Sequence, residues 1–365
     1  MKFVSGDRVF FMLVLIMAFA GLAIFSSAAL GLLARESSSV SRDILLQSGL
    51  GLGLGLFALV CARAIPFALI KRFAPYIYVA TLIFTALVFV PGIGSNFGGA
   101  TRWIDLGLTT VQPAEFLKIG FVLVLAWWLA PRARQFSNPK KGLLPLIAFI
   151  IPSAVILLAQ PNTSTTLLFI ATGMVMYFAA GAPLRDFGIM TLIVLLVLGG
   201  IISTRGYALE RVKTFFNPSA NSLSSGYQIQ QSLIAIGSGG LLGRGFGQSV
   251  EKFNYLPEPA GDSVFAVFSE ETGFIGALFL LALFVALSAR GIAIAGNSHD
   301  LFGGLVALGF SFMIILQAFI NICAMLGIIP LTGLPLPFIS HGGTALVAIL
   351  IMCGLILNVA SHRRL

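Results

Sequence analysis

Long apolar runs separated by short polar segments dominate the chain, and their lengths predict its architecture. Several runs reach about 18 to 25 residues, the length that an α-helix needs to cross the hydrocarbon core of a bilayer. We therefore predict an all-α polytopic membrane protein with about ten transmembrane helices. The predicted spans are residues 9–34, 43–64, 74–94, 113–130, 142–159, 164–182, 186–203, 263–289, 300–327 and 338–360.

The composition supports the membrane assignment. Of the 365 residues, 58% are hydrophobic and only 10% are charged, whereas a soluble domain carries about 25% charged residues. The first apolar run follows MKFVSGDR and has no small-residue cleavage site, so it is interpreted as a retained helix. The three cysteines lie in or beside apolar runs without metal-ligand spacing, and we expect Cys61, Cys323 and Cys353 to be buried.

The distribution of the positive charge indicates the orientation of the helices. The net charge is +9, but no basic stripe with interleaved aromatic residues is present, which argues against nucleic acid as a partner. Ten spans place both termini on one side, and the short loops on that side hold most of the Lys and Arg residues. The positive-inside rule therefore predicts that both termini are cytoplasmic.

One long polar segment, residues 204–262, is predicted to form an extracytoplasmic loop between the seventh and eighth helices. A loop of this length in a compact protein is usually functional. Within it, QIQQSLIAI is predicted to form an amphipathic helix at the outer surface, with Leu233, Ile234 and Ile236 facing lipid. We expect residues 1–365 to form one transmembrane domain that includes this loop.

Charged residues inside or beside the predicted spans are the first candidates for chemistry. Glu115 and Lys118 stand at i, i+3, so they share one helix face and can pair. Charges inside a membrane are functional candidates, although a structural ion pair is an equal alternative. Arg102 precedes Trp103 at the predicted outer interface, where it could bind phosphate or simply anchor the chain.

Three carboxylates occur within ten residues in the stretch GDSVFAVFSEE. Asp262 stands at the mouth of the predicted eighth helix, where it is either an N-cap or a general base or cation ligand at the outer face. Glu270 and Glu271 are consecutive, so about 100° separates them around the helix. At most one can face a given cavity, and the other needs a basic partner.

The segment PLTGLPLPFISHGG is predicted to be irregular at membrane depth. Pro330, Pro335 and Pro337 prevent regular helix. Such backbone is tolerated where it is packed in protein or lines a cavity. His341 can titrate near neutral pH, but a single histidine is more often a hydrogen-bonded structural residue.

Six motifs follow one another in the chain: GGATRWIDLG, QPAEFLK, GYQIQQSLIAIGSGG, GRGFGQSVEKFNYLPEP, GDSVFAVFSEETGFIG and PLTGLPLPFISHGG. In this order they resemble signatures of the SEDS family (shape, elongation, division and sporulation proteins). The resemblance runs from about residue 90 to the C-terminus, and the wording of GQSVEKFNYLPEP is more similar to the cell-division members than to the elongation members.

The resemblance implies a peptidoglycan glycosyltransferase that polymerises lipid II at the outer face of the bacterial cytoplasmic membrane, for cell division and cell shape. It implies an inverting reaction on an undecaprenyl-diphosphate donor, with no nucleotide or organic cofactor. It also implies a class B penicillin-binding protein as partner, together with other divisome or elongasome membrane proteins.

The resemblance also implies roles for individual residues. Asp262 matches the essential aspartate of the family and is the expected catalytic base, and a divalent cation (Mg or Mn) bound there is a further candidate. Residues expected to bind substrate are Arg102, Glu115, Lys118, Glu258, Ser340, Gly342 and Gly343. Glu258 is included only because its predicted exposure would let it assist a cation.

The chain departs from the family pattern at two positions, and two other functions remain open. His341 stands where the family usually has tyrosine, and Asn162 where aspartate is common. A flippase that moves lipid II across the membrane would use the same intramembrane polar residues to line a path. A scaffold that recruits a transpeptidase would need them only for helix packing.

Overall fold

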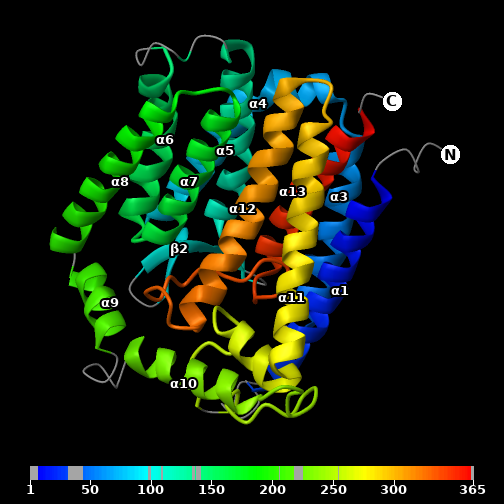
Figure 1. Cartoon of the computed structure of the whole chain (residues 1–365), viewed down its shortest axis with the longest axis vertical. Coiled ribbons are helices and arrows are strands. Elements are labelled where there is room, and N and C mark those ends of the chain that lie inside the picture. The colour runs from blue at the N-terminus through cyan, green and yellow to red at the C-terminus, as the bar shows by residue number, and fades with distance from the viewer. Residues whose placement is uncertain are drawn as a thin grey trace.

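The computed structural model of the chain is a bundle of roughly parallel and antiparallel helices, capped at one end by shorter helices and loops (Figure 1). The structure describes residues 7–31, 44–97, 100–107, 110–133, 136, 141–204, 206–217, 225–253 and 255–362.

Ten apolar helices match the ten predicted spans, which confirms the predicted fold class. Eight are long and apolar enough to cross a membrane, and α6 and α7 are shorter at 17 residues each. They are α1 (Arg8–Ala29), the span Ile44–Ala64 with the π-helix η2 (Gln47–Gly53) and α3 (Leu54–Ala64), α4 (Phe67–Ala86, followed by η3, Leu87–Phe89), α5 (Pro113–Leu129, followed by η4, Ala130–Arg132), α6 (Leu143–Ala159), α7 (Thr163–Ala179), α8 (Leu184–Thr204), α11 (Val264–Gly296), α12 (Leu301–Met325) and α13 (Gly343–Ser361).

The helices differ in how much surface they bury, and this difference fixes their places in the bundle. In the most apolar stretch of α5, 83% of the residues are buried, whereas in that of α8 only 11% of the residues are buried. A helix that is apolar on all sides and surrounded by protein belongs to the core. Helix α5 therefore lies at the centre with α12 and α13, and α8 lies at the edge of the bundle (Figure 1).

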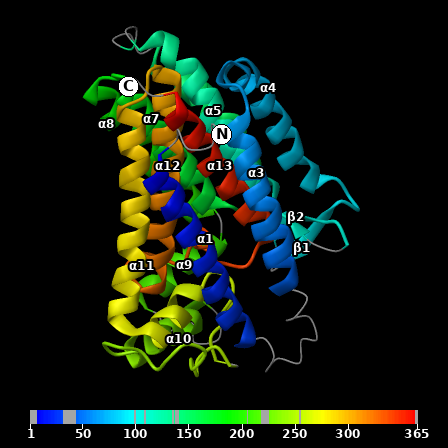
Figure 2. The same cartoon turned by 90° about the vertical axis from the view of Figure 1, so that its right-hand side faces the viewer.

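The first and last helices fix the two ends of the molecule. Helix α1 begins and α13 ends at the same end of the bundle, while α10 (Ser225–Ser238) and the start of α11 lie at the other end (Figures 1 and 2). This arrangement agrees with both termini being on one side, although residues 1–6 and 363–365 lie outside the described residues.

The predicted long loop contains two helices. Helix α9 (Gly206–Phe216) and helix α10 fall within residues 204–262. Helix α10 includes the predicted QIQQSLIAI helix, and there Leu233 and Ile234 are exposed while Ile236 is partly buried. Because two separate helices form, the segment is a folded cap of the bundle.

A small sheet was not predicted. Strands β1 (Gly94–Phe97), β2 (Ala100–Asp105) and β3 (Thr110–Val111) form an antiparallel sheet in the order β1-β2-β3 after the end of α4 (Figure 2). Short strands among glycines give little periodic signal. The sheet carries Arg102 on β2.

Helix α11 is broken at Gly273, whose φ of 68° and ψ of −169° are not helical. The carbonyls of Glu270 and Glu271 accept hydrogen bonds from the amides of Arg244 (3.0 Å) and Gly245 (3.0 Å). The amides that follow the break donate to the same loop, Phe274 N to Gly240 O at 2.9 Å. The loop after α10 therefore supplies the hydrogen bonds that an unbroken helix would make with itself.

The cysteines only partly follow the prediction. Cys353 is buried and Cys323 is partly buried, but Cys61 is exposed on α3. The expectation for Cys61 was wrong because α3 has an outward apolar face, where a small hydrophobic residue needs no protein cover.

Candidate active site

Asp262 lies just before α11, and its carboxylate faces a neighbouring helix. Gln228 of α10 donates from Nε2 to Asp262 Oδ1 (3.1 Å) and to Ser263 Oγ (2.9 Å). The N-cap position of α11 belongs to Ser263, so the capping alternative for Asp262 was wrong. The half-buried carboxylate of Asp262 is held by a side chain from α10.

The backbone around Asp262 is fixed from two directions. Asn321 of α12 donates from Nδ2 to the carbonyl of Asp262 at 2.8 Å. Two residues earlier, the carbonyl of Ala260 accepts the amide of His341 at 2.7 Å. The Asp262 turn is therefore joined to α12 and to the segment 326–342 that follows α12.

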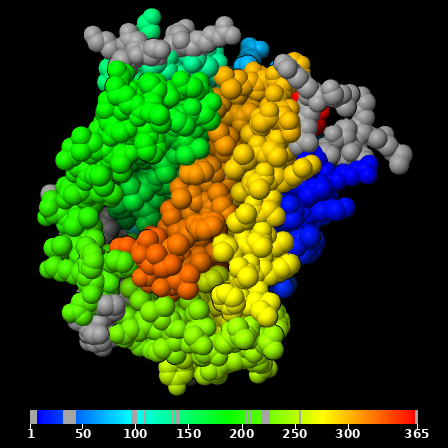
Figure 3. Space-filling view, viewed as in Figure 1, coloured from blue at the N-terminus to red at the C-terminus, as the bar shows by residue number. Residues whose placement is uncertain are grey.

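Arg211 of α9 approaches Asp262 across Gly333. A Cβ placed on Gly333 would stand 3.9 Å from Arg211 Nη2 and 3.9 Å from Asp262 Oδ2. Arg211 Nη1 donates to Thr332 O at 3.3 Å, and Ser164 Oγ of α7 donates to the same carbonyl at 2.9 Å. The guanidinium is thereby held beside Gly333, near the carboxylate. Figure 3 shows the segment after α12 (orange) reaching the surface next to α9.

The surroundings of Asp262 favour its neutral form. Removal from water and the nearby charge of Glu258 raise the pKa of Asp262 to about 6, although the Gln228 hydrogen bond and the charge of Arg211 act in the opposite direction. A carboxyl group with a pKa near 6 exchanges protons readily at neutral pH. This combination of a raised pKa and a facing cation is common at functional sites.

Glu258 lies beside Asp262 and is exposed, as predicted. Its carbonyl accepts the amides of Gly261 (3.0 Å) and Ser263 (3.3 Å), and its φ is 47°. The turn that brings the two carboxylates together is therefore closed by its own backbone.

Glu115 and Lys118 form a buried ion pair, away from the Asp262 carboxylate. Lys118 Nζ lies 2.7 Å from Glu115 Oε1, and both side chains are at most 2% exposed. The same ammonium donates to Gln317 Oε1 of α12 at 2.7 Å. Lys118 thus binds two protein side chains, and the structure supports the interpretation of Glu115 and Lys118 as a structural ion pair.

Arg102 joins the sheet to the turn between α6 and α7. Its Nε donates to Gln160 O at 3.0 Å, and its Nη2 donates to Pro161 O. The guanidinium thus binds backbone carbonyls of the protein. This contact fixes β2 against the bundle and occupies donors that a phosphate would require.

Ser340, Gly342 and Gly343 shape the segment before α13. Ser340 Oγ accepts the amide of Leu336 at 2.7 Å, and the amide of Gly342 donates to Gln47 Oε1 at 3.3 Å. A Cβ on Gly343 would stand 3.4 Å from the backbone nitrogen of Gly51. These residues hold the irregular segment against the π-helix η2.

His341 is joined to the same region through its ring. The imidazole stacks on Phe25 of α1, with ring centroids 5.6 Å apart. Together with its backbone bond to Ala260, this contact supports the structural interpretation of His341.

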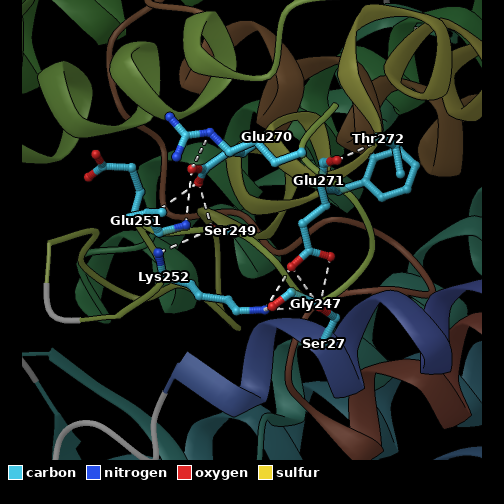
Figure 4. A network of polar contacts seen from close by, with 11 residues as sticks. Ser27, Gly247, Ser249, Glu251, Lys252, Glu270, Glu271 and Thr272 are labelled. Atoms are coloured by element: carbon cyan, nitrogen blue, oxygen red, sulfur yellow. Dashed lines mark hydrogen bonds and ion pairs between the residues drawn. The ribbon is translucent and has the colours of Figure 1, made fainter. Parts of the chain in front are cut away.

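Glu270 and Glu271 each have a basic partner, as the sequence required for one of them (Figure 4). Glu270 Oε1 lies 3.4 Å from Arg244 Nε, and Glu271 Oε1 lies 2.7 Å from Lys252 Nζ. Ser27 of α1 donates to Glu271 at 2.7 Å. The two carboxylates therefore bind the loop after α10 to α11 and α1.

Three functional candidates were missed by sequence reasoning. Arg211 and Gln228 fall inside the segment expected to be a loop, and Asn321 falls inside an apolar span. Gln228 belongs to a motif that the sequence analysis quoted, but only its apolar neighbours were interpreted. A polar amide in the last turns of the apolar helix α12 is the signal that could have identified Asn321.

Comparison with known proteins places the chain among membrane proteins of the bacterial cell cycle. The FtsW/RodA/SpoVE family, described as "Cell cycle protein", matches residues 7–365. The chain is 38% identical to Stage V sporulation protein E of Bacillus subtilis (strain 168) over 312 residues, which are 86% of this chain and 85% of that protein. It is also 38% identical to the probable peptidoglycan glycosyltransferase FtsW of Coxiella burnetii (strain RSA 493 / Nine Mile phase I) over 315 residues, 85% and 84% of the two chains.

Two solved structures share the fold. One is a chain of a peptidoglycan synthase complex, described in terms of the structural coordination of polymerization and crosslinking. It aligns with a TM-score of 0.80 and 28% identity over 98% of both chains. The other is the crystal structure of Thermus thermophilus rod shape determining protein RodA, with a TM-score of 0.72 and 28% identity over 100% of both chains.

Proposed function

The chain belongs to the FtsW/RodA/SpoVE family of cell cycle proteins, and we propose that it is a peptidoglycan glycosyltransferase that polymerises lipid II with Asp262 as catalytic base. The family membership confirms the SEDS resemblance of the sequence. The relatives named peptidoglycan glycosyltransferase FtsW support the activity, and the chain is a multi-pass membrane protein.

The observation that carries the proposal is that Asp262 and Arg211 both lie next to Gly333, each with one side-chain atom 3.9 Å from its Cβ position. A glycosyl transfer needs a base for the acceptor hydroxyl and a cation for the departing diphosphate. Both groups occur here at the end of the bundle opposite to the start of α1, and between them stands a residue without a side chain. A side chain at this position would contact both groups, so glycine keeps a side chain out from between the base and the cation.

In the proposed reaction, the Asp262 carboxylate takes the proton of the acceptor's sugar hydroxyl. The hydroxyl oxygen then attacks the anomeric carbon of the lipid-linked donor, and the bond from that carbon to the diphosphate oxygen breaks. Attack opposite to the leaving group inverts the anomeric centre, which converts an α-linked donor into a β-linked product. The electron pair of the broken bond leaves with the undecaprenyl diphosphate.

Arg211 is the cation that we assign to the leaving group. A guanidinium can bind two phosphate oxygens at once, and a positive charge placed where negative charge develops lowers the barrier. Arg102 and Lys118 were the sequence-based candidates, but their donors bind protein groups. We therefore assign Arg102 and Lys118 a structural role, in which they hold the protein around the site in place.

A divalent cation would be held by Asp262 and Glu258. Mg²⁺ is typically bound by one or two carboxylates together with substrate phosphates, and these two side chains form such a pair. Among the described residues, no group of three or more His, Cys, Asp or Glu residues is placed so that it could hold a metal ion, and the proposed ion would take its other ligands from the substrate. When bound, the ion would offset charge on the diphosphate.

The site is assigned to the outer face of the bacterial cytoplasmic membrane, with both termini in the cytoplasm. The excess of basic residues in the short loops supports this orientation. A class B penicillin-binding protein is the proposed partner, supported by the structural similarity to a chain of a peptidoglycan synthase complex. A role in septal wall synthesis is supported by the FtsW names among the relatives.

Purified protein in lipid vesicles, with its transpeptidase partner and lipid II, distinguishes this function from a lipid II flippase. We expect glycan polymer, separated by length on a gel, and we expect Asp262→Ala to abolish it while the protein remains folded. Passage of lipid II across the vesicle membrane without polymer would instead support the transporter. Absence of both activities would support the scaffold.

A further inference from the structure

A line of buried polar contacts joins the Glu115–Lys118 pair to Asp262 along α12. Lys118 donates to Gln317 Oε1 at 2.7 Å, and Gln317 donates from Nε2 to Pro335 O at 2.8 Å. One helical turn further along α12, Asn321 donates from Nδ2 to two carbonyls, those of Leu334 and Asp262, both at 2.8 Å.

The two amides act on adjacent residues of the segment after α12. Gln317 holds Pro335, and Asn321 holds Leu334, which directly follows Gly333. Gly333 is the residue that separates Arg211 from Asp262. A single face of α12 therefore fixes both the backbone of Asp262 and the backbone that spaces it from Arg211.

We propose that Asn321 and Gln317 are positioning residues that hold Asp262 in its reactive place, and that Glu115 and Lys118 act on the reaction through them. The inference rests on the proposed function, because it assigns the means by which that site is held. It gives the charged pair of α5 a role in catalysis without contact between the pair and the substrate.

Burial gives these contacts their effect. Asn321 is 1% exposed and Gln317 is 3% exposed. Because water does not reach these side chains, a carbonyl that loses its hydrogen bond to one of them is left buried without a partner, which is costly. Asn321 Oδ1 and Glu115 Oε2 are buried without a hydrogen-bond partner among the described residues. The side-chain hydrogen bonds of Asn321 are therefore donated by its NH₂ group, which binds the carbonyls of both Asp262 and Leu334.

The carboxylate of Asp262 is held from the other side by Gln228. Asn321 fixes the backbone and Gln228 fixes the side chain, so loss of Asn321 lets the whole turn shift relative to Arg211. A displacement of about 1 Å between reacting groups can lower a rate about 100-fold. Loss of Asn321 should therefore lower kcat, with little change in KM, because the substrate contacts are not removed.

Asn358 provides a matched control for Asn321. It is also a buried asparagine whose Nδ2 donates to carbonyls, those of Ala62 (3.1 Å), Arg63 (2.8 Å) and Ile65 (2.7 Å). Its Oδ1 likewise has no partner among the described residues. It lies near the end of α13, whereas the candidate active site adjoins the beginning of that helix.

The test compares Asn321→Leu with Asn358→Leu in the complete protein with its partner, using lipid II polymerisation and thermal unfolding. We expect both variants to have a lower Tm, and only Asn321→Leu to lose kcat, by about 10- to 100-fold. Equal kcat in the two variants, measured below both Tm values, would overturn the proposal. If Asn321→Leu does not fold, Gln317→Leu is measured in its place with the same two outcomes.

The link to the charged pair is tested by combining Lys118→Met with Gln317→Leu. If Lys118 acts through Gln317, the double variant loses about as much kcat as the more severe single variant. Losses that multiply would show independent action and contradict the proposal. Asp262→Asn separates the two hypotheses: if it keeps full activity, the catalytic assignment fails, whereas an inactive Asp262→Asn with no effect of Asn321→Leu rejects only the positioning role.

Discussion

At the scale of single residues, the central feature is the ionisation of Asp262. The base acts in its ionised form, so kcat/KM should rise as the pH increases through about 6 and become constant above it. Glu258 raises the pKa of Asp262 and Arg211 lowers it. Glu258→Gln should therefore move the midpoint of the profile to lower pH, and Arg211→Gln should move it to higher pH.

The rate of lipid II polymerisation between pH 5 and 8 measures these midpoints. Arg211→Gln should also reduce the rate at every pH because the leaving group loses its cation, but the midpoint is independent of that loss. A midpoint that stays in place in both variants would show that another group controls the reaction.

The same ionisation predicts an effect on stability. The ordinary pKa of an aspartate is 3.8, and that of Asp262 in the folded protein is about 6. Between these values the folded state binds more protons, so the free energy of unfolding falls as the pH rises toward 6 and then stays constant. Asp262→Asn cannot ionise and should be more stable than the wild type above pH 6, by about 1 to 3 kcal/mol.

Thermal unfolding in detergent at pH 4 and pH 7 checks this expectation. The stability advantage of Asp262→Asn should be present at pH 7 and largely absent at pH 4. A variant that is less stable than the wild type at pH 7 would mean that the ionised carboxylate stabilises the fold, contrary to the environment described for it.

At the scale of elements, the junction between α11 and the preceding loop depends on glycine. A Cβ on Gly243 would stand 2.2 Å from Glu271 O, and φ at Gly243 is +79°. Gly247 has a similar φ of +81°, but no described atom lies within 4 Å of its Cβ position. Alanine would be strained by the positive φ at both positions, but it would clash with another residue only at Gly243. A comparison of the two substitutions therefore distinguishes the steric clash from the backbone strain.

Gly243→Ala should lower the Tm in detergent much more than Gly247→Ala. Positive φ costs an alanine about 1 kcal/mol, and the clash adds to this cost only at Gly243. Similar Tm losses in the two variants would show that the loop moves away from α11 without difficulty, and the junction would then not fix the Asp262 segment.

The elements were predictable to the extent that they carry a periodic or apolar signal. The ten spans follow from long, predominantly apolar runs such as that of α12. Helix α9 and the small sheet were missed because they are short and are formed among polar residues and glycines. The break in α11 was also missed, since Gly273 alone does not reveal that Gly243 inserts beside it.

The candidate site was predictable only in part, for a physical reason. Asp262 is conspicuous because a carboxylate at a membrane helix entrance is costly. Arg211, Gln228 and Asn321 reach it from three different helices, and no local pattern specifies such contacts. Arg102 and Lys118 were conspicuous for the same reason as Asp262, but the structure provides them with protein partners.

At the scale of the whole molecule, the proposed orientation puts the end of the bundle that carries α10 on the extracytoplasmic side and the beginning of α1 in the cytoplasm. Chemical labelling of single cysteines tests this orientation. Gln248→Cys lies on the exposed loop after α10, and His299→Cys lies in the exposed turn between α11 and α12 at the other end. In a background without native cysteines, a membrane-impermeant maleimide should label Gln248→Cys in intact cells and His299→Cys only after permeabilisation.

The opposite labelling pattern would place Asp262 in the cytoplasm. Polymerisation of an extracytoplasmic cell-wall precursor could not then occur at this site, so the proposed function would lose its geometric basis. A cytoplasmic control protein must remain unlabelled in intact cells. This control shows that the maleimide has not crossed the membrane, so labelling of both positions cannot be ascribed to leakage.

The initial rate of lipid II polymerisation by Asp262→Asn shows whether the Asp262 carboxylate is the catalytic base. The substitution removes the base but keeps the shape of the side chain. Glu210→Gln serves as the control, because it removes an exposed carboxylate of α9 that has no role in the proposed site. We expect a folded Asp262→Asn protein with a rate at least about 100-fold below that of the wild type, and a Glu210→Gln protein that polymerises at the wild-type rate. Polymerisation by Asp262→Asn at the wild-type rate would show that Asp262 is not the catalytic base.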